Sequence, residues 1–360
     1  MSDPKSSRPL SDKGCTPLFP LVCILILNWN RCEETLECLE SVAALSYLHL
    51  HTIVIDNGSH DRSVAEIERR FPQTELIKNR SNLGYAAGNN AGISRGIEIG
   101  AEYFLVLNND VRLAPDAVDW AVSAATSLGS AAGVIGMAIY EAAVPDKIYC
   151  FGADEQQRFI TEEVRESGES RIFPVHSVAG CAMLLSKKLV QTIGGFYPDF
   201  FLMYEETDLC ARAANKGFSV VCAYKARAWH KGSLSFGGRR SPLVVFYCRR
   251  NKALYLERRL AECGALKDLP IELQHYFADA KAATRSHLQG LRFRSAFAEL
   301  AAARCALARR WGKKSISFRT WLYTFLYLSC ITTPALLTKA VEYASRLAGR
   351  TFHFLSTEFR

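Results

Sequence analysis

Short apolar runs alternate with helical patterns along the first 240 residues of the chain. The runs at 21–27 and 103–107 are continuously apolar, which is typical of strands that are buried on both faces, and residues 51–55 are predicted to form a further strand. Between 21–27 and 51–55, residues 33–45 place their apolar side chains at helical spacing. Buried strands separated by helices predict an α/β fold with a doubly wound, mostly parallel sheet.

The rest of the chain follows the same pattern, apart from one irregular stretch. We expect helices over about 61–70, 187–193 and 205–216, strands over 75–78, 180–185 and 220–223, and a helix that follows a glycine-rich stretch and ends near Gly100. Residues 140–177 are rich in charge and have no clear periodicity, which predicts an irregular insertion. Beyond Pro242 the chain is rich in Ala, Leu and Arg and is predicted to be helical.

The chain has a net charge of +8, and this charge is distributed unevenly along it. Residues 241–360 hold 20 Lys and Arg against 8 Asp and Glu, a net charge of +12, which leaves −4 for residues 1–240. We therefore expect a flexible N-terminus at 1–18, a catalytic domain at 19–240, and a basic helical region at 241–360. The opposite net charges of the two larger regions indicate that they bind different partners. The length of 360 residues and the 49% hydrophobic content exclude a disordered tail, a collagen-like repeat and a small disulfide scaffold.

The twelve cysteines form no Cys-x-x-Cys pair, and several lie inside apolar runs, which indicates buried free thiols and a cytoplasmic protein. Residues 21–27 are too short a run for the core of a signal peptide. Residues 321–338 carry no charge and are flanked by basic residues. A buried core helix, a contact with the membrane surface and a membrane span all remain open for this stretch. We expect a peripheral contact of 241–360 with the cytoplasmic face of a membrane.

Polar residues follow the predicted strands, where ligands bind in parallel α/β sheets. Asp56, Asn57 and Ser59 come directly after the second strand, and a carboxylate there is able to bind a nucleobase or a ribose hydroxyl. The alternative is an Asx-type turn that caps the next helix.

The glycine-rich stretch at 82–92 carries Gly84, Gly88 and Gly92. Glycines allow close backbone approach, and the N-terminus of the following helix favours an anion such as a diphosphate. The stretch is neither a dinucleotide fingerprint nor a P-loop, because it has neither the glycine spacing nor the lysine of those motifs. Tight helix packing is the alternative explanation.

Two further groups of residues indicate chemistry. Asn109 and Asp110 follow the fourth strand, where a carboxylate flanked by amides suits a hard divalent cation that also binds a substrate diphosphate. Glu205, Glu206 and Asp208 repel one another, which raises at least one pKa towards the range of a general base. The alternative for these acids is a favourable place in a first helical turn, with Asp208 paired to Arg212.

Taken together, the order and spacing of these motifs resemble glycosyltransferase family 2, in particular its rhamnosyltransferase-like branch. The resemblance covers residues 21–236, about 60% of the chain. The matching stretches are residues 27–30, 56–59, 82–90, 107–110, 204–209 and 229–230.

The resemblance implies a GT-A fold, a nucleotide-diphosphate-sugar donor, Mg²⁺ or Mn²⁺, and inversion at the anomeric carbon. Asp110 would contact the metal, and His230 would approach the metal or the diphosphate. Glu206 falls where the family usually carries its general base, with Glu205 beside it, so that either glutamate is a candidate. Donor contacts are expected from Asn28, Asn30, Asp56, Asn57, Ser59, Asn82, Gly84, Gly88, Asn89 and Asn109.

We therefore expect transfer from a dTDP- or UDP-sugar, with dTDP-rhamnose as one candidate, to a glycan or lipid-linked acceptor in cell-envelope polysaccharide synthesis. A sugar-nucleotide nucleotidyltransferase is the first alternative, although residues 28–32 lack the basic phosphate loop that it needs. A catalytically inactive membrane-surface module is the second. No motif indicates nucleic acid as a partner. The sugar, the acceptor hydroxyl and the oligomeric state stay open.

Overall fold

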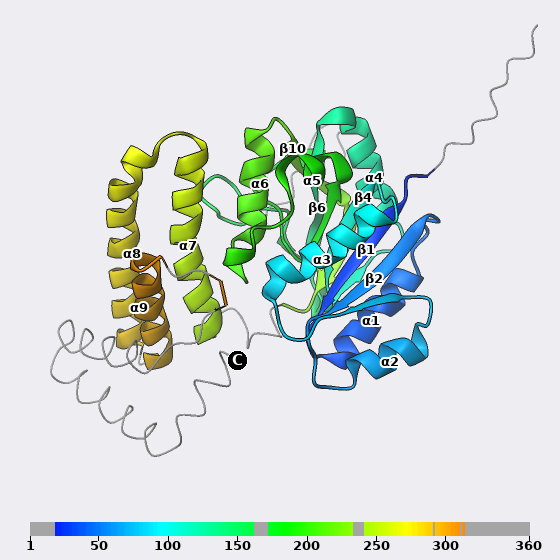
Figure 1. The fold of residues 1–360 in the computed structure, drawn as a ribbon, viewed down its shortest axis with the longest axis horizontal. Helices are drawn as coiled ribbons and strands as arrows, with labels where there is room; N and C mark the ends of the chain where they lie inside the picture. The colour runs from blue at the N-terminus through cyan, green and yellow to red at the C-terminus, as the bar shows by residue number, and fades with distance from the viewer. Residues whose placement is uncertain (1–18, 162–171, 233–240, 291, 310–311, 314–360) are drawn as a thin grey trace, which may run out of the picture.

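The structure is a computed structural model that describes residues 19–161, 172–232, 241–290, 292–309 and 312–313. The N-terminus at 1–18 and the uncharged stretch at 321–338 lie outside the described residues. Figure 1 shows a twisted sheet with helices on both of its faces and a separate group of long helices beside it.

The sheet has ten strands in the described part of the chain, in the order β3-β2-β1-β4-β9-β6-β10-β5, with β7 beside β6 and β8 beside β10. The strands are β1 (Val22–Asn28), β2 (Leu50–Asp56), β3 (Glu75–Lys78), β4 (Tyr103–Asn108), β5 (Val111–Leu113), β6 (Ala132–Glu141), β7 (Val144–Cys150), β8 (Ile172–Pro174), β9 (Ala182–Ser186) and β10 (Ser219–His230). The first four pair in parallel, as does β6 with β10, whereas β9 runs antiparallel to β4 and β6.

Two hydrophobic clusters cover the two faces of the sheet, since successive side chains of a strand point to opposite faces. In β1, Ile24 and Ile26 join one cluster, and Cys23 and Leu25 join the other. The helices of the first face are α1 (Cys32–Ala43), α2 (Ser63–Arg70) and α4 (Ala117–Leu128). The helices of the second face are α3 (Gly84–Glu98), α5 (Lys187–Ile193) and α6 (Glu205–Asn215).

The C-terminal helices are α7 (Pro242–Glu262), α8 (Leu269–Gln289) and α9 (Phe293–Leu307), which lie side by side in Figure 1. Helix α7 contributes Phe246 and Tyr247 to the second cluster, and α9 contributes Ala298 and Ala301. The hydrophobic core is therefore continuous from the sheet into the helical region. Within the described residues, no helix combines the length and the apolar character that a membrane span requires.

The predicted α/β class, the sheet with its parallel half, and the helical C-terminal region are confirmed. The expectation of an irregular insertion at 140–177 was wrong in part, because it contains β7 and β8. Strand β7 lies at the sheet margin with exposed side chains and shifts of register, which removes the alternation that marks a strand. The strand expected at 220–223 extends to His230, because a bulge between Ala223 and Arg227 breaks its pattern.

Candidate active site

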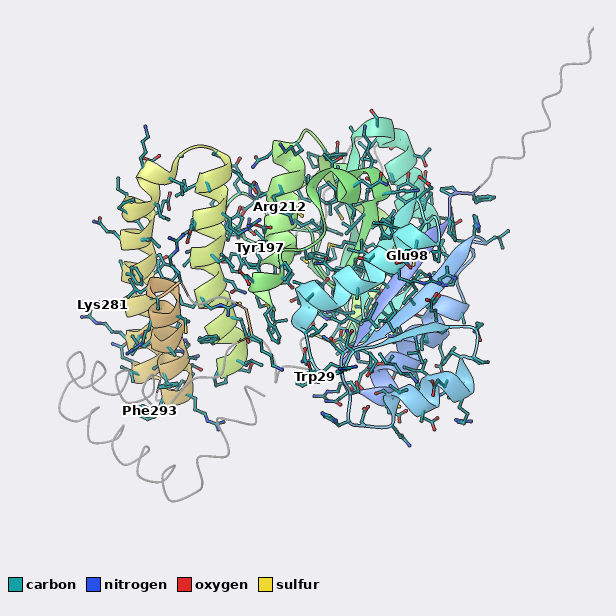
Figure 2. The ribbon with its side chains drawn as sticks, viewed as in Figure 1. Trp29, Glu98, Tyr197, Arg212, Lys281 and Phe293 are labelled. Atoms are coloured by element: carbon teal, nitrogen blue, oxygen red, sulfur yellow. The ribbon has the colours of Figure 1, made fainter. Side chains whose placement is uncertain are left out.

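Register within the sheet brings the predicted polar residues together. Asn28 and Asp56 are direct partners at the ends of β1 and β2, and Asn108 pairs with Leu27 one position earlier. Asn109 and Asp110 follow Asn108 in the turn to β5. Three strand ends thus deliver their polar residues to one edge of the sheet. Trp29, which follows β1, lies at this edge in Figure 2.

Asn28 is an internal support for Asp56. Its Nδ2 donates to Asp56 Oδ1 at 2.8 Å and to Ser59 Oγ at 3.1 Å, while its Oδ1 accepts from Thr35 Oγ1 at 2.7 Å. Asp56 Oδ2 accepts from the Ser59 backbone at 3.1 Å, so the expected Asx-type turn is present as well. Both groups of the Asn28 amide are therefore occupied inside the protein, and Asp56 is held in one orientation.

A second network fixes the glycine-rich turn before α3. Asn57 Nδ2 donates to Asn82 Oδ1 and to the Gly84 carbonyl, each at 3.1 Å, and Asn82 Oδ1 accepts from the Gly84 backbone at 2.8 Å. Gly84 has a φ of 84°, and a Cβ at this position would overlap the ring of Phe201. The turn thus needs glycine for its conformation and for the close approach.

One cavity of about 230 Å³ adjoins both networks and the acidic start of α6. It is lined by Asn57, Asn82, Gly84, Asn109, Asp110, Glu205, Glu206 and His230, which were predicted, and by aromatic and small residues that include Trp29, Tyr85, Tyr149, Phe159, Gly180 and Cys181. The structure therefore brings the predicted metal and base residues, and four of the ten predicted donor residues, to a single cavity.

Asp110 and His230 face each other at the end of β10. His230 Nε2 lies 3.1 Å from Asp110 Oδ1, and the two side chains are 6% and 8% exposed. Within the described residues, neither ring nitrogen has a hydrogen-bond partner of good geometry, although Nε2 lies close to the Asp110 carboxylate. Burial opposes protonation of His230, but Cys181 and Asp110 outweigh it and raise its pKa to about 11. A buried carboxylate and a neutral imidazole are suitable ligands for a divalent cation, which would displace the proton that His230 carries next to Asp110.

Glu205 and Glu206 begin α6 beneath the cavity. Glu205 is 4% exposed, and its Oε2 has no hydrogen-bond partner in the described residues. Glu206 is partly exposed, and its Oε1 accepts from Thr207 Oγ1 at 3.1 Å. Burial, and then the charge of Glu206, raise the pKa of Glu205 well above its usual value. Burial also raises the pKa of Glu206, in the direction that suits a general base.

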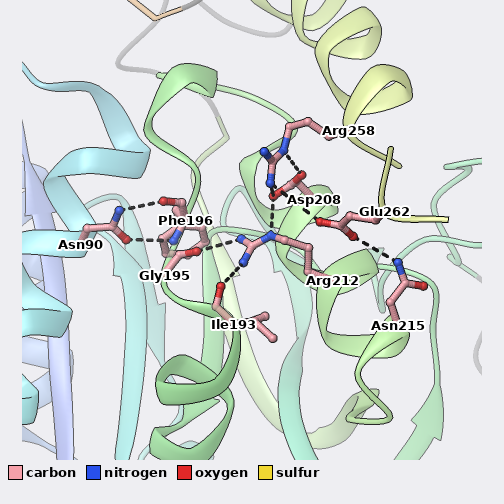
Figure 3. Close-up of polar contacts among 9 residues, drawn as sticks. All are labelled: Asn90, Ile193, Gly195, Phe196, Asp208, Arg212, Asn215, Arg258 and Glu262. Carbon is pink, nitrogen blue, oxygen red and sulfur yellow. Dashed lines mark hydrogen bonds and ion pairs between the residues drawn. The ribbon is translucent and has the colours of Figure 1, made fainter. Parts of the chain in front are cut away.

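Asp208 has a different role from its acidic neighbours (Figure 3). It accepts from Arg212 Nε at 2.7 Å and from Arg258 Nε of α7 at 2.7 Å. Arg212 also donates to the carbonyls of Ile193 and Gly195, each at 2.8 Å. The predicted pair of Asp208 with Arg212 is present. Through Arg258 it extends into a network that joins α6 to α7, and Figure 2 shows Arg212 between these two helices.

Several predicted donor residues do not line the cavity. Gly88 packs so closely that a Cβ would overlap Leu27, which supports tight packing for this glycine. Asn89 is fully buried and donates to the Tyr85 carbonyl at 3.0 Å. Asn28, Asn30, Asp56 and Ser59 form the adjoining network, in which Ser59 Oγ accepts from the Asn30 backbone at 2.7 Å.

Comparison with known proteins identifies the family. Residues 23–193 match the family model described as glycosyl transferase family 2. A curated N-acetylglucosaminyl-diphospho-decaprenol L-rhamnosyltransferase of Mycobacterium tuberculosis is 24% identical over 248 residues, which are 62% of this chain and 78% of that protein. The chain belongs to glycosyltransferase family 2. The predicted resemblance and the assignment as a glycosyltransferase are thereby confirmed.

Two further likenesses are more distant. The hexosyltransferase Agl10 of low-salt glycan biosynthesis in Haloferax volcanii is 22% identical over 240 residues, which are 64% of this chain and 74% of that protein. The solved structure of the mannosyltransferase PcManGT from Pyrobaculum calidifontis, in complex with GDP-Man and Mn²⁺, superposes with a TM-score of 0.48 at 15% identity, over 89% of this chain and 86% of that one.

This glycosyltransferase has cavity residues that the sequence did not reveal. Tyr149 and Phe159 come from the region expected to be irregular, and their rings lie 5.7 Å apart beside His230. Gln157 lines the cavity with a φ of 60°. No periodic pattern marks these positions: Tyr149 lies in β7, which pairs with β6 through shifts of register, and Phe159 forms an isolated bridge with Ala153. Cys181 was recognised as buried, but its position in the cavity follows only from the sheet order.

Proposed function

We propose that this glycosyltransferase moves a sugar from a dTDP- or UDP-sugar to a glycan or lipid-linked acceptor, with inversion at the anomeric carbon. The observation that carries the proposal is the single cavity that Asp110, His230, Glu205 and Glu206 all line. The relative from Mycobacterium tuberculosis bears a name that specifies transfer of L-rhamnose to a diphospho-decaprenol lipid. This name supports dTDP-rhamnose as a donor and a lipid-linked acceptor in envelope polysaccharide synthesis.

The donor would bind along the edge formed by the strand ends. Asp56, held by Asn28, has the charge and the fixed orientation needed to accept hydrogen bonds from a base or ribose. Asn57, Asn82 and Gly84 form the rigid turn before α3, whose helix N-terminus favours a diphosphate. Asp110 and His230 would hold Mg²⁺ or Mn²⁺. When bound, such an ion stabilises the negative charge of the leaving diphosphate.

The acceptor hydroxyl needs a base within hydrogen-bond reach as it attacks the anomeric carbon. Glu206 is the better candidate, because its carboxylate lines the cavity and is partly exposed, whereas Glu205 is more deeply buried. The proton would pass from the acceptor oxygen to Glu206 while the bond from the anomeric carbon to the leaving phosphate breaks. One base and no covalent intermediate are sufficient for inversion.

The test is a panel of sugar nucleotides with Mg²⁺ or Mn²⁺, with and without a lipid-linked acceptor. We expect release of nucleoside diphosphate from one donor class, loss of turnover with a chelator, and a product of inverted anomeric configuration by NMR. Asp110→Asn should lose most of the activity at low metal concentration. Retention of configuration, or full turnover in the presence of the chelator, would contradict the proposal. Net synthesis of a sugar nucleotide with release of pyrophosphate would favour the nucleotidyltransferase alternative.

We also propose that the protein is cytoplasmic and that residues 241–360 contact the membrane surface that carries the acceptor. The net charge of +12 in this region supports an anionic surface as the partner. Sedimentation with vesicles of anionic lipid should retain the full chain and release it at high salt. Equal recovery with zwitterionic and anionic vesicles at low salt would contradict this part of the proposal.

A further inference from the structure

One short loop connects the two parts of the active site. It runs from the 3-10 turn Pro198–Phe200 to Tyr204, and Glu205 begins α6 immediately after it. The carbonyl of Phe201 accepts from the Tyr85 backbone at 2.6 Å, and the Phe201 ring packs against Gly84. The loop therefore contacts the glycine-rich turn and also leads directly into the two glutamates.

The backbone of this loop adopts an unusual conformation. Phe201, Met203 and Tyr204 all have positive φ, at 62°, 70° and 74°. Residues with a Cβ avoid this region, and they stay in it only where surrounding contacts force the conformation. The contacts that hold the loop therefore determine where Glu205 and Glu206 stand.

Those contacts come from α7, in the region expected to be a basic appendage. Asn251 Nδ2 lies within donating distance of three loop carbonyls, those of Phe200 at 2.8 Å, Leu202 at 2.6 Å and Met203 at 2.7 Å. Arg250 Nη2 donates to the Asp199 carbonyl at 3.1 Å and to the Phe200 carbonyl at 2.8 Å.

The two α7 side chains are also locked to each other. Arg250 Nε donates to Asn251 Oδ1 at 2.8 Å, which leaves the asparagine nitrogen directed at the loop. The Arg250 guanidinium lies 4.7 Å from the centre of the Tyr247 ring, and both Arg250 and Asn251 are 0% exposed. The pair is thus a rigid set of donors directed at four loop carbonyls, those of Asp199, Phe200, Leu202 and Met203.

Arg250 is costly to bury. Desolvation lowers its pKa to about 10, and no ion pair of the described residues includes it. An apolar side chain of similar volume is often as stable or more stable than a buried charge. The arginine therefore contributes something other than packing. Its Nη2 donates to the loop, while its Nε donates to Asn251 and its Nη1 donates to the carbonyl of Gly312.

We propose that Arg250 and Asn251 are positioning residues that hold the loop at 198–204 in the one conformation that presents Glu205 and Glu206 to the cavity. This inference rests on the proposed role of a glutamate as general base. It makes α7 part of the catalytic unit, although its sequence lies beyond the matched family region, which ends at residue 193.

The test compares Arg250→Met with Arg249→Met. Arg249 is the adjacent residue, but it pairs with Glu299 of α9 at 2.6 Å, away from the loop. Asn251→Ala is the second loop variant, since it removes the three carbonyl contacts and the acceptor of Arg250 Nε, while the two Nη2 contacts of Arg250 with the loop are kept. Each full-length variant is measured for kcat, for the KM of the donor, and for hydrogen exchange of the amides at 198–206.

We expect both loop variants to exchange these amides at least tenfold faster and to lose about 100-fold in kcat, because small displacements of a catalytic group have effects of this size. The donor KM should change less than threefold, and Arg250→Lys should recover part of kcat. Arg249→Met should leave loop exchange and kcat near the wild-type values.

Unchanged exchange at 198–206 in a folded Asn251→Ala protein would overturn the inference, as would faster exchange with unchanged kcat. If the wild-type chain transfers no sugar to any acceptor, the proposed function fails, while the exchange measurement still decides whether the pair holds the loop. An equal loss of kcat in Arg249→Met would show a general loss of stability and would also overturn the inference.

Discussion

Glu205 and Glu206 are neighbours in sequence but have different surroundings. Glu205 is buried with an unpartnered oxygen, whereas Glu206 is partly exposed and accepts from Thr207. A carboxylate that must receive a proton from a substrate needs access to the cavity and a pKa above the usual range. Glu206 meets both conditions, whereas burial favours the protonated, uncharged form of Glu205.

Glu206→Gln should therefore remove most of the transfer activity, by about 10²- to 10⁴-fold, which is the usual contribution of a general base. Because burial raises the pKa of Glu206, activity should rise with pH across an acid limb above 4.5. The measurement is kcat/KM against pH for both proteins. A pH-independent residual rate in the Gln variant fits the role, and an unchanged acid limb would contradict it.

Glu205→Gln should stabilise the protein at neutral pH. Burial favours the protonated form of Glu205 in the folded state, so the carboxyl has no effect on stability below its unfolded pKa and is increasingly destabilising as pH rises from the unfolded pKa towards the raised folded pKa. Glutamine imitates the neutral form. Thermal unfolding of both proteins should give equal Tm values near pH 4 and a higher Tm for the variant at pH 8. A lower Tm for the variant at pH 8 would exclude this account.

Residue types and their order were enough to predict the ionisable residues Asp110, His230, Glu205 and Glu206 of the cavity, which lie at strand ends or begin a helix. The sequence could not show that the Asn28 amide bonds to Asp56 inside the protein. An asparagine at this strand end is equally suited to contact a donor and to support a neighbouring carboxylate. Nor could the sequence reveal Arg250, since a buried arginine and a solvated one look alike in a basic helix.

At the scale of elements, the turn before α3 offers a test with an internal control. Gly84 and Gly100 have the same φ of 84°, but a Cβ at Gly84 would meet Phe201, whereas nothing lies within 4 Å of one at Gly100. Each Ala substitution should cost about 1–2 kcal/mol for the left-handed conformation. Gly84→Ala should cost more and also weaken donor binding.

Urea unfolding measures the stability of both glycine variants, and titration with nucleoside diphosphate measures donor binding. Gly100→Ala reports the backbone cost alone, because it lies at the far end of α3 from the cavity. Equal destabilisation by the two substitutions, with donor binding intact in both, would show that the contact between Gly84 and Phe201 has no effect.

Elements with regular local patterns were predictable, and those with irregular pairing were not. Strands β1 and β4 are almost continuous apolar runs and β2 ends in a short one, so their sequence identifies them. The second half of β10 follows a bulge, and β7 pairs with β6 through shifts of register. Sheet partners, rather than local residues, fix such segments, and the aromatic side of the cavity depends on them.

At the scale of the whole molecule, some basic residues of the C-terminal region lie inside the protein and stabilise it. Arg258 pairs with Asp208 of α6, Arg249 pairs with Glu299, and Arg250 is buried. A part of the positive charge that predicted a docking surface is therefore used inside the protein: Arg258 holds α6, Arg250 holds the loop before it, and Arg249 joins α7 to α9. The division at residue 240 stays a prediction, but the hydrophobic core and the ion pairs cross it.

This continuity predicts how two truncated proteins will behave. A chain that ends at residue 313 keeps every described contact of α7 and α9 with the catalytic part, and it should unfold cooperatively. A chain that ends at residue 240 loses Phe246 and Tyr247, which are fully or almost fully buried in the shared core. Each such side chain contributes about 1.5–3 kcal/mol, a large share of a typical total stability of about 5–15 kcal/mol.

The shorter chain also loses the partners of the 198–204 loop and should aggregate or melt at least 10 °C lower by circular dichroism. Cooperative melting of the 1–240 chain at the temperature of the 1–313 chain would show that α7 is a dispensable appendage.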